Sequence, residues 1–342
     1  MRILQLITSF SFAGAERIAL DLCTLAGCHV ELAALTPGNG QLRVRAEARG
    51  ISCHDLAMRH KADLAVVGRL RDRLEAGRFD LLHTHLVHAD IIGRLATQGR
   101  TPTLSTLHLV ERRWRPWHGW GESLTARWAR AFVAVSPAVL EHGVHRWGLP
   151  LEKMHLIPNG VSLEGIPGST RDIDILFLGR LDRQKGLDRL LPGLALAQKT
   201  QPLKVAIAGI GPEEASLKTL AMAHGVDAQW MGFVENAASL MARAKVVAVP
   251  SRWEGFGLVA AEALAAGCDV VHSGVPPLTW VTGTHGTVLP KGPKDIASLM
   301  VERVTRFEEN AQRRQWVASM FSLESMKKSY VELYTACAAS PA

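Results

Sequence analysis

The chain has 342 residues, of which 47% are hydrophobic and 21% charged, and a formal net charge of +7 at pH 7. This length is enough for two domains with separate cores, and no apolar run reaches the roughly 20 residues that a membrane-spanning helix needs. The five cysteines are odd in number and irregular in spacing, which argues against a disulfide framework or a zinc site and favours a reduced, cytoplasmic protein.

Positive charge is concentrated in the first half of the chain. Residues 1–165 contain 20 Lys and Arg residues against 15 Asp and Glu, whereas residues 166–342 contain 19 against 17. A basic surface attracts anionic lipids, nucleic acids or phosphorylated substrates. Charge alone does not choose among these partners.

The chain begins with an apolar run typical of a buried strand, residues 2–8, and a loop that leads into a helix. Gly14 lies in this loop, where the absence of a Cβ lets a ligand approach the backbone closely. Strands and helices then alternate. Ser136 and Pro137 form a helix start, with an N-cap followed by proline at the first helical position.

Histidines follow two of the predicted strands. One strand ends in His83, His85 and His88, and the next, in residues 101–110, ends at His108. An H-x-H pair can bind a metal, but no third ligand follows at a recognisable spacing, so no metal site is predicted. Ligands of open α/β sheets bind beyond the carboxyl ends of strands. We therefore expect His108 to face a ligand crevice, the alternative being a structural histidine.

Residues 111–130 interleave tryptophan with arginine. Such a mixture suits a membrane interface, where the indole ring lies at headgroup depth and the cation meets phosphate. It suits stacking on nucleic acid or sugar equally well, and burial of the tryptophans in a core is the third interpretation. The residues are Arg112, Arg113, Trp114, Arg115, Trp117, Trp120, Arg127, Trp128 and Arg130.

A short linker, residues 164–172, precedes a new strand, loop and helix. Arg180 and Lys185 lie in that loop, where fixed cations can stabilise developing negative charge; the alternative is a solvated basic loop. Asp172 and Asp174 form a D-x-D pattern that could hold a divalent metal. They precede the strand instead of ending it, so a metal is not favoured there.

Gly209 and Gly211 follow another predicted strand. The third glycine of a dinucleotide fingerprint is missing, which argues against a Rossmann dehydrogenase. Near the end of the chain, residues 294–318 are predicted to be helical, and residues 321–339 to form a terminal amphipathic helix.

The segment 251–267 combines a glycine loop with a helix. Gly255 and Gly257 keep Cβ atoms out of the loop, so that a ligand can reach amides at the helix N-terminus, where the macrodipole is positive. That position suits a phosphate or sugar hydroxyls. Glu254 lies in the loop and Glu262 about two turns into the helix. Alanines surround Glu262, so its carboxylate needs a partner such as a ribose diol; the alternative is a solvated glutamate on a core helix.

Residues 254–267, E-G-F-G-L-V-A-A-E-A-L-A-A-G, resemble the E-x7-E signature of retaining glycosyltransferases of the GT-B fold, family 4, also called glycosyl transferases group 1. A second stretch, G-R-L-D-R-Q-K-G at 179–186, resembles the loop with which the family binds the donor pyrophosphate. Similar stretches recur in the family's order over about residues 2–335.

The resemblance implies roles for the matching residues. Arg180 and Lys185 would neutralise the diphosphate, Glu254 would orient the donor sugar, and Glu262 would bind the ribose. His108 would approach the donor sugar and the acceptor. The expected catalytic residues are His108, Arg180, Lys185 and Glu254. The expected donor-binding residues are Gly14, Gly209, Gly211, Phe233, Val234, Phe256, Gly257, Leu258 and Glu262.

Two segments depart from the family pattern. The family usually carries two adjacent glycines where this chain has Ala13 and Gly14. It also usually shows a glycine-rich turn and then a glutamate where this chain has residues 275–277, V-P-P, and Trp280. The second departure lies near the sugar end of the donor site, so it bears on the identity of the donor sugar.

We therefore expect an α/β protein of the GT-B fold, with two Rossmann-like domains facing across a cleft. Residues 1–165 would form the N-terminal acceptor-binding domain and residues 166–318 the nucleotide-sugar domain. Residues 319–342 would form a helix that packs back on the first domain.

The expected function is transfer of a sugar, with retention, from a nucleoside-diphosphate donor, with UDP as the expected nucleotide. The acceptor would be a glycan or a lipid-linked glycan of cell-surface polysaccharide or lipopolysaccharide synthesis. We expect no metal, no cofactor besides the donor and no nucleic-acid partner, and a cytoplasmic protein that binds the anionic inner leaflet peripherally. The alternatives are a nucleotide-sugar 2-epimerase of the same fold and a non-catalytic protein that binds nucleotide sugars or polyanions. The oligomeric state is left open.

Overall fold

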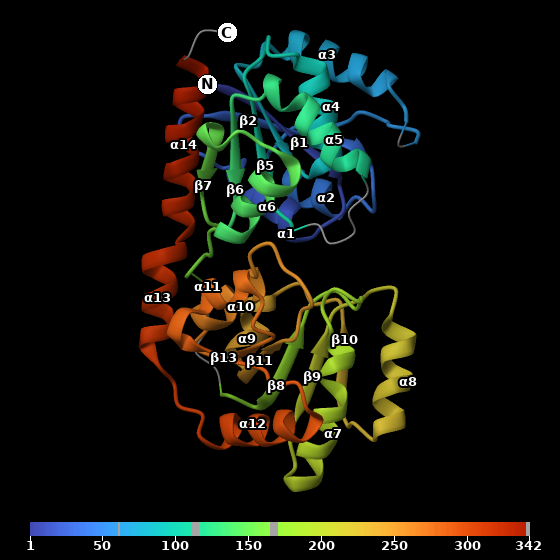
Figure 1. Cartoon of the computed structure of the whole chain (residues 1–342), viewed down its shortest axis with the longest axis vertical. Coiled ribbons are helices and arrows are strands. Elements are labelled where there is room, and N and C mark those ends of the chain that lie inside the picture. The colour runs from blue at the N-terminus through green and yellow to red at the C-terminus, as the bar shows by residue number, and fades with distance from the viewer. Residues whose placement is uncertain (61, 111–115, 165–169, 340–342) are drawn as a thin grey trace. The chain divides into compact units, whose positions relative to one another are not determined.

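The computed structural model describes residues 1–60, 62–110, 116–164 and 170–339, with the backbone alone for residues 116–118 (Figure 1). The chain forms two compact units. The first contains residues 1–160 and 324–342, and the second contains residues 161–323. Within the described residues, no helix is both long and apolar enough to span a bilayer.

The first unit is built on a parallel sheet of seven strands in the order β3-β2-β1-β4-β5-β6-β7. The strands are β1 (Arg2–Ser9), β2 (His29–Thr36), β3 (Cys53–Asp55), β4 (Leu81–His85), β5 (Thr103–Leu107), β6 (Ala131–Ala134) and β7 (Met154–Leu156). The helices are α1 (Gly14–Leu22), α2 (Gln41–Glu47), α3 (Ala65–Gly77), α4 (Val87–Thr97), α5 (Pro116–Thr125), α6 (Pro137–Trp147) and α14 (Leu323–Ala339). The strand order reverses between β1 and β4, which is where open α/β sheets bind ligands.

The sequence accounts for these elements. The predicted first strand is confirmed: β1 is buried along most of its length, as expected for a parallel strand covered on both faces. The predicted start of α6 is also confirmed, because Ser136 Oγ accepts a hydrogen bond from the Val139 amide at 3.3 Å and Pro137 takes the first helical position.

Two buried tyrosines of the C-terminal helix α14 form hydrogen bonds with the sheet of the first unit. Tyr334 Oη lies 2.7 Å from His83 Nδ1 on β4, and Tyr330 Oη lies 3.0 Å from Thr106 Oγ1 on β5. Gln5 on β1 also donates to Tyr334, at 3.4 Å. Because both tyrosines are fully buried, these bonds satisfy polar groups that would otherwise destabilise the core.

The second unit contains a parallel sheet of six strands in the order β10-β9-β8-β11-β12-β13. The strands are β8 (Ile173–Leu178), β9 (Val205–Ala208), β10 (Gln229–Gly232), β11 (Ala244–Val249), β12 (Asp269–His272) and β13 (Gly286–Val288). The helices are α7 (Leu191–Thr200), α8 (Glu214–His224), α9 (Ala237–Ala242), α10 (Leu258–Ala265), α11 (Pro276–Thr282), α12 (Pro293–Thr305) and α13 (Ala311–Phe321).

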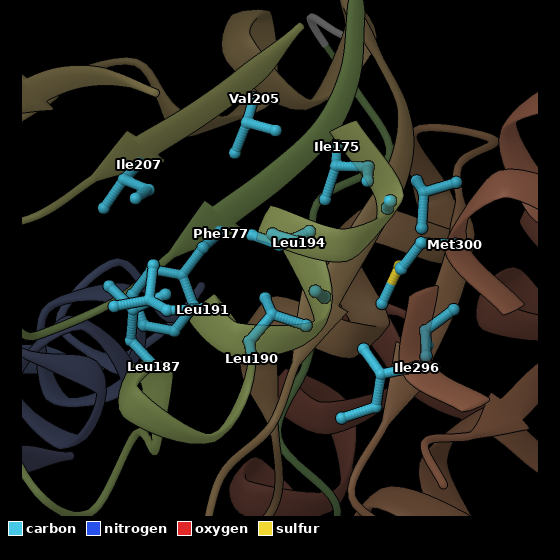
Figure 2. Close-up of a cluster of buried hydrophobic side chains, with 14 of the residues drawn as sticks. Ile175, Phe177, Leu187, Leu190, Leu191, Leu194, Val205, Ile207, Ile296 and Met300 are labelled. Atoms are coloured by element: carbon cyan, nitrogen blue, oxygen red, sulfur yellow. The ribbon is translucent and has the colours of Figure 1, made fainter. Parts of the chain in front are cut away.

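Figure 2 shows the core on one face of this second sheet, where side chains of β8 and β9 meet those of the segment 187–194 and of α12. The predicted helical region at 294–318 is confirmed except between the two helices, because it divides into α12 and α13. The reason is Asn310, whose side chain accepts a hydrogen bond from the Gln312 amide at 2.8 Å and so starts a new helix.

Candidate functional site

Three loops meet at the carboxyl edge of the second unit's sheet. They follow β8, β9 and β11, which are neighbours in the sheet and therefore end at the same edge. Backbone hydrogen bonds join them: the Leu181 amide donates to the Ile210 carbonyl at 3.0 Å, and the Arg252 amide to the Gln184 carbonyl at 2.7 Å. Most of the predicted donor-binding residues lie on these loops and on the helix that follows the last of them.

Lys185 and Glu254 form an ion pair between two of these loops. Lys185 Nζ lies 2.6 Å from Glu254 Oε1, and Ser251 Oγ donates to the same carboxylate oxygen at 2.7 Å. The side chain of Glu254 is only 8% exposed and that of Lys185 22%. The structure thus brings together the cation predicted for the diphosphate and the carboxylate predicted for the donor sugar.

A second ion pair joins the same loops, but here the basic residue follows β11 and the acidic residue follows β8. The Arg252 guanidinium donates to both carboxylate oxygens of Asp188, at 2.7 and 2.6 Å. The hydrogen bond from Arg252 is the largest cause that lowers the pKa of Asp188. Sequence reasoning missed this pair. The available signal was that both loops carry acids and bases, among them Lys185 and Asp188 on one and Arg252 and Glu254 on the other.

Arg180 lies apart from the Lys185–Glu254 pair. Its side chain is 60% exposed, and Nε lies 2.5 Å from Asp182 Oδ2. The terminal Nη2 is 3.5 Å from Gln184 Oε1. Arg180 is thus a solvent-facing cation at the rim of the site, whereas Lys185 is a part-buried one inside it.

Three glycines of the site lie where a Cβ atom would clash with a neighbouring group. Gly209 has φ 141°, and a Cβ there would lie 1.9 Å from the Gly179 carbonyl oxygen. Gly257 has φ 105°, and its Cβ would lie 2.4 Å from the side chain of Leu278. Gly211 is similarly constrained, by the Leu181 carbonyl at 2.3 Å. A side chain at Gly209 or Gly211 would clash with the backbone of the loop after β8, whereas one at Gly257 would clash with the Leu278 side chain and strain a left-handed backbone.

The helix α10 begins at the end of the third loop. Its N-cap is Gly257, which has no side chain to cap the first amides, and Leu258 opens the helix. Helix amides without partners and the positive end of the dipole favour an anionic or polar ligand. Glu262 is half-buried on the same helix, next to the fully buried Ala261 and Ala263.

The side chain of Phe256 belongs to an aromatic cluster and not to an open site. It is 3% exposed, and its ring centroid lies 6.0 Å from Trp280 and 5.4 Å from Phe321. Any contact of Phe256 with a ligand therefore falls to its backbone. Trp280, where the family pattern has a glutamate, supplies packing that holds this backbone in place.

Apolar side chains are exposed at the other end of the same sheet edge. Phe233 follows β10 and is 44% exposed, and Ile210 follows β9 and is 49% exposed. The Gly209 amide donates to the Gly232 carbonyl at 2.7 Å, so the two segments adjoin. Val234, the neighbour of Phe233, is half-buried. The sequence predicted only the flanking Gly209 and Gly211 as donor-binding residues and did not indicate Ile210.

The D-x-D pattern lies at the opposite edge of the sheet. Arg243 binds both oxygens of Asp172, at 2.8 and 2.6 Å, and Lys245 Nζ lies 2.7 Å from Asp174 Oδ1. Both carboxylates are thus held by cations, and β8 begins between them.

In the first unit, His108 follows β5 and is buried beside a cavity of about 300 Å³. His108 Nε2 lies 2.9 Å from His85 Nδ1, and His85 Nε2 lies 2.5 Å from Gln5 Oε1. His83 bonds to Tyr334 and Thr106 through its two ring nitrogens. All four nitrogens of the H-x-H pair are therefore used by protein groups.

Burial sets the charge of these three histidines. It lowers the pKa of His108 to about 3, and it lowers the pKa values of His83 and His85 well below the usual 6.5. The rings are therefore neutral near pH 7. Gly14, the remaining predicted residue of this unit, is the first residue of α1.

The tryptophan- and arginine-rich segment is described only in part. Arg112, Arg113, Trp114 and Arg115 lie outside the described residues, as does the side chain of Trp117. On α5, Trp120 is 67% and Leu124 71% exposed. The Arg127 guanidinium carbon lies 4.6 Å from the centroid of Trp128.

The other face of α5 is anchored by a buried ion pair. Arg94 Nη2 on α4 lies 2.5 Å from Glu122 Oε2, and both side chains are fully buried. Trp120 and Leu124, four residues apart, form an apolar exposed face on the anchored helix.

The sequence matches family models over most of its length. Residues 165–319 match glycosyl transferases group 1, and residues 12–164 match glycosyltransferase family 4. Glycogen synthase of Mycobacterium tuberculosis is 27% identical over 288 residues, 76% of this chain and 69% of that protein. Phosphatidyl-myo-inositol mannosyltransferase of Mycobacterium leprae is 29% identical over 280 residues, 75% and 71% of the two chains.

Solved structures resemble the whole chain. HepE of Anabaena, in complex with UDP and glucose, has a TM-score of 0.86 at 19% identity and covers 98% of this chain and 100% of its own. A glycosyltransferase of Rickettsia africae has a TM-score of 0.82 at 16% identity and covers 99% of both chains. At these identities the likeness establishes the fold, which is GT-B with two Rossmann-like units, as predicted.

Proposed function

The chain belongs to the family 4 glycosyltransferases, the glycosyl transferases group 1, and on this premise we propose that it transfers a sugar from a UDP-sugar, with retention at the anomeric carbon. The observation that carries the proposal is the Lys185–Glu254 ion pair at the carboxyl edge of the second unit's sheet. It combines a cation for a leaving diphosphate with a carboxylate for a sugar. UDP is chosen because the similar HepE structure contains UDP and glucose.

The leaving diphosphate is the group that needs stabilisation. As the glycosidic bond breaks, negative charge grows on the phosphate oxygens, and preorganised cations stabilise that charge without reorganisation. In our proposal Lys185 turns from Glu254 to the diphosphate when the donor binds, and Arg180 reaches it from the rim. Ser251 keeps its 2.7 Å hydrogen bond to Glu254, so the carboxylate stays in place for the sugar.

The remaining proposed donor contacts come from α10 and from the loops that precede it and that follow β9 and β10. Glu262 accepts hydrogen bonds from the ribose diol, and the amides of Phe256 and Gly257 orient the sugar at the start of α10. Gly209, Gly211 and the exposed Phe233 border the nucleoside. The proposed reaction needs no metal, since Arg180 and Lys185 supply the positive charge, and the carboxylates of the D-x-D pattern are held by Arg243 and Lys245.

We propose a glycan or lipid-linked glycan as the acceptor, in the synthesis of a cell-surface polysaccharide or lipopolysaccharide. A relative at 29% identity is a phosphatidyl-myo-inositol mannosyltransferase, whose acceptor is a lipid by its name. The exposed face of α5, with Trp120 and Leu124, suits contact with a membrane interface. In this account the protein works in the cytoplasm, against the anionic inner leaflet.

The test is a donor screen with product analysis. The protein is incubated without acceptor with UDP-, GDP- and ADP-sugars, and NMR follows the sugar and the nucleotide. Slow release of UDP and of a free sugar supports a retaining transferase if the released sugar first has the same anomeric configuration, α or β, as the donor. Conversion of the donor to its 2-epimer would instead support the epimerase, and tight binding without turnover would support a non-catalytic protein.

A further inference from the structure

A chain of buried hydrogen bonds runs from helix α14 through the sheet of the first unit to His108. Gln5 Nε2 on β1 donates to the Tyr334 hydroxyl on α14 at 3.4 Å. His85 Nε2 on β4 lies 2.5 Å from Gln5 Oε1, and His85 Nδ1 lies 2.9 Å from His108 Nε2. Gln5, His85 and Tyr334 are fully buried. Protein groups therefore determine where the hydrogen atoms of this chain lie.

The Gln5 amide determines which nitrogen of His85 carries the hydrogen. An amide oxygen can only accept, so His85 Nε2 must donate to it. Burial lowers the pKa of His85 well below the usual 6.5, so near pH 7 the ring is neutral and has a single N–H. His85 Nδ1 is therefore a lone pair, and it accepts its hydrogen bond from His108 Nε2.

The same reasoning places the hydrogen of His108. Its ring is neutral near pH 7, because burial lowers its pKa to about 3. The single N–H is Nε2, which donates to His85, so Nδ1 is a lone pair. In the described part of the chain, Nδ1 has no hydrogen-bond partner. His108 thus offers a ligand a hydrogen-bond acceptor, and near pH 7 that nitrogen has no proton to give.

Tyr334 holds the Gln5 amide in the orientation on which this assignment depends. If the amide turned over, Nε2 would donate to His85, and both histidines would have to carry their hydrogen on Nδ1. The Tyr334 hydroxyl opposes this reversal, because it gives its own hydrogen to His83 Nδ1 at 2.7 Å and accepts one from Gln5 Nε2. In a buried network the bonds depend on one another, so α14 influences the hydrogen position on His108.

We propose that Gln5 and Tyr334 are positioning residues, which hold His108 as the tautomer with its hydrogen on Nε2 and a lone pair on Nδ1. The consequence for catalysis rests on the proposed function, in which His108 approaches the donor sugar and the acceptor, as the family resemblance implies. There His108 accepts a hydrogen bond from a hydroxyl group and does not protonate the leaving diphosphate. The C-terminal helix thereby contributes to the chemistry through Tyr334.

The tautomer is measured by NMR without any donor. Long-range correlation of ring hydrogens with ring nitrogens, in the full chain labelled with ¹⁵N-histidine at pH 7.5, distinguishes an N–H from a lone-pair nitrogen. The chain has 14 histidines, so the signals of His108 are assigned by their loss in His108→Ala. We expect the hydrogen on Nε2 alone. A hydrogen on Nδ1, or on both nitrogens, would overturn the proposal.

Variants test the two positioning residues. Gln5→Met removes the amide at similar length, and Tyr334→Phe removes the hydroxyl that orients it. In each, a second form of His108 with its hydrogen on Nδ1 should appear, and kcat for donor hydrolysis should fall about tenfold or more at an unchanged donor KM. The matched control is Tyr330→Phe, which removes an equally buried hydroxyl of α14 that bonds to Thr106 instead of Gln5. It should leave the His108 signals and kcat as in wild type.

The outcomes separate this inference from the proposed function. If Gln5→Met and Tyr334→Phe keep the His108 hydrogen wholly on Nε2, or if Tyr330→Phe changes the tautomer as much as Tyr334→Phe, the positioning role is refuted. The expected tautomers without turnover of any donor would refute the proposed function and leave the control of His108 standing. Donor turnover at the wild-type kcat in both Gln5→Met and Tyr334→Phe would refute this inference alone.

Discussion

Lys185 Nζ and Glu254 Oε1 lie 2.6 Å apart, although 69 residues separate them in the chain. The parallel order β9-β8-β11 places the loops after β8 and β11 side by side. The ion pair links these two loops. The pair neutralises two part-buried charges. In the proposed reaction the same lysine serves the leaving diphosphate.

A charge swap separates the structural role of this pair from its chemical one. The double variant Lys185→Glu/Glu254→Lys restores an ion pair, so we expect near-normal folding, but it places a carboxylate where the diphosphate leaves. Turnover should therefore fall at least 100-fold, as with loss of a preorganised charge stabiliser. The measurement is nucleotide release together with the thermal unfolding midpoint.

The matched control is the neighbouring pair, Arg252 and Asp188. Its swap, Arg252→Asp/Asp188→Arg, alters the same two loops by the same chemistry, but our proposal assigns neither residue to the donor. This swap should recover most of the activity that either single variant loses. If the Lys185/Glu254 swap also recovers activity, the lysine has a structural role only.

The ribose contact of Glu262 is tested by calorimetry. Glu262→Ala removes a charged acceptor from a diol, and a hydrogen bond to a charged group contributes about 1.5–3 kcal/mol. UDP affinity should therefore fall roughly ten- to hundredfold. Glu262→Gln retains an acceptor and should lose less. Wild-type UDP affinity in Glu262→Ala would remove this residue from the site.

The buried histidines predict a loss of stability in mild acid. The pKa of His108 is lowered to about 3, and those of His83 and His85 are also lowered by burial. Below pH 6.5 the unfolded chain takes up protons that the folded chain does not. The free energy of unfolding should then fall as pH drops from 6.5 towards 3, by up to about 1.4 kcal/mol per pH unit for each ring.

The first unit has its own optical probe for this effect. The chain contains two tyrosines, Tyr330 and Tyr334, and both are buried on α14 against this sheet. Urea unfolding followed by tyrosine absorbance should show a midpoint at pH 5.5 well below that at pH 7.5. An equal or higher midpoint at pH 5.5 would contradict the neutral, buried state of the three rings.

Membrane contact through α5 is tested with vesicles. Basic residues near an anionic surface contribute a salt-sensitive attraction of about 1 kcal/mol each, and exposed tryptophan adds anchoring that salt does not screen. Binding to anionic vesicles should fall with salt and reach a residual level. The double variant Trp120→Ala/Leu124→Ser should abolish the binding that remains at high salt. Equal binding to neutral and anionic vesicles at low salt would exclude this surface and favour a soluble acceptor.

The sequence predicted features that depend on local patterns. The glycine positions, the start of α6 at Ser136 and the strand that His108 follows are set by backbone conformation, capping and apolar runs, which a short segment reveals. The family resemblance added the roles of Lys185, Glu254 and Glu262, which stay proposals until they are measured.

Contacts between distant segments could not be predicted in this way. The Arg252–Asp188 pair depends on the sheet order, which decides which loops adjoin. The bond between His83 and Tyr334 links residues that are 251 positions apart.

The central claim, sugar transfer from a nucleotide donor at the Lys185–Glu254 site, is tested most directly by the rate of UDP release from UDP-sugars in EDTA. The wild-type protein should release UDP from at least one UDP-sugar without added metal, and Lys185→Ala should lower that rate at least 100-fold per folded molecule. No UDP release by the wild type, or the same rate in Lys185→Ala, would contradict the account.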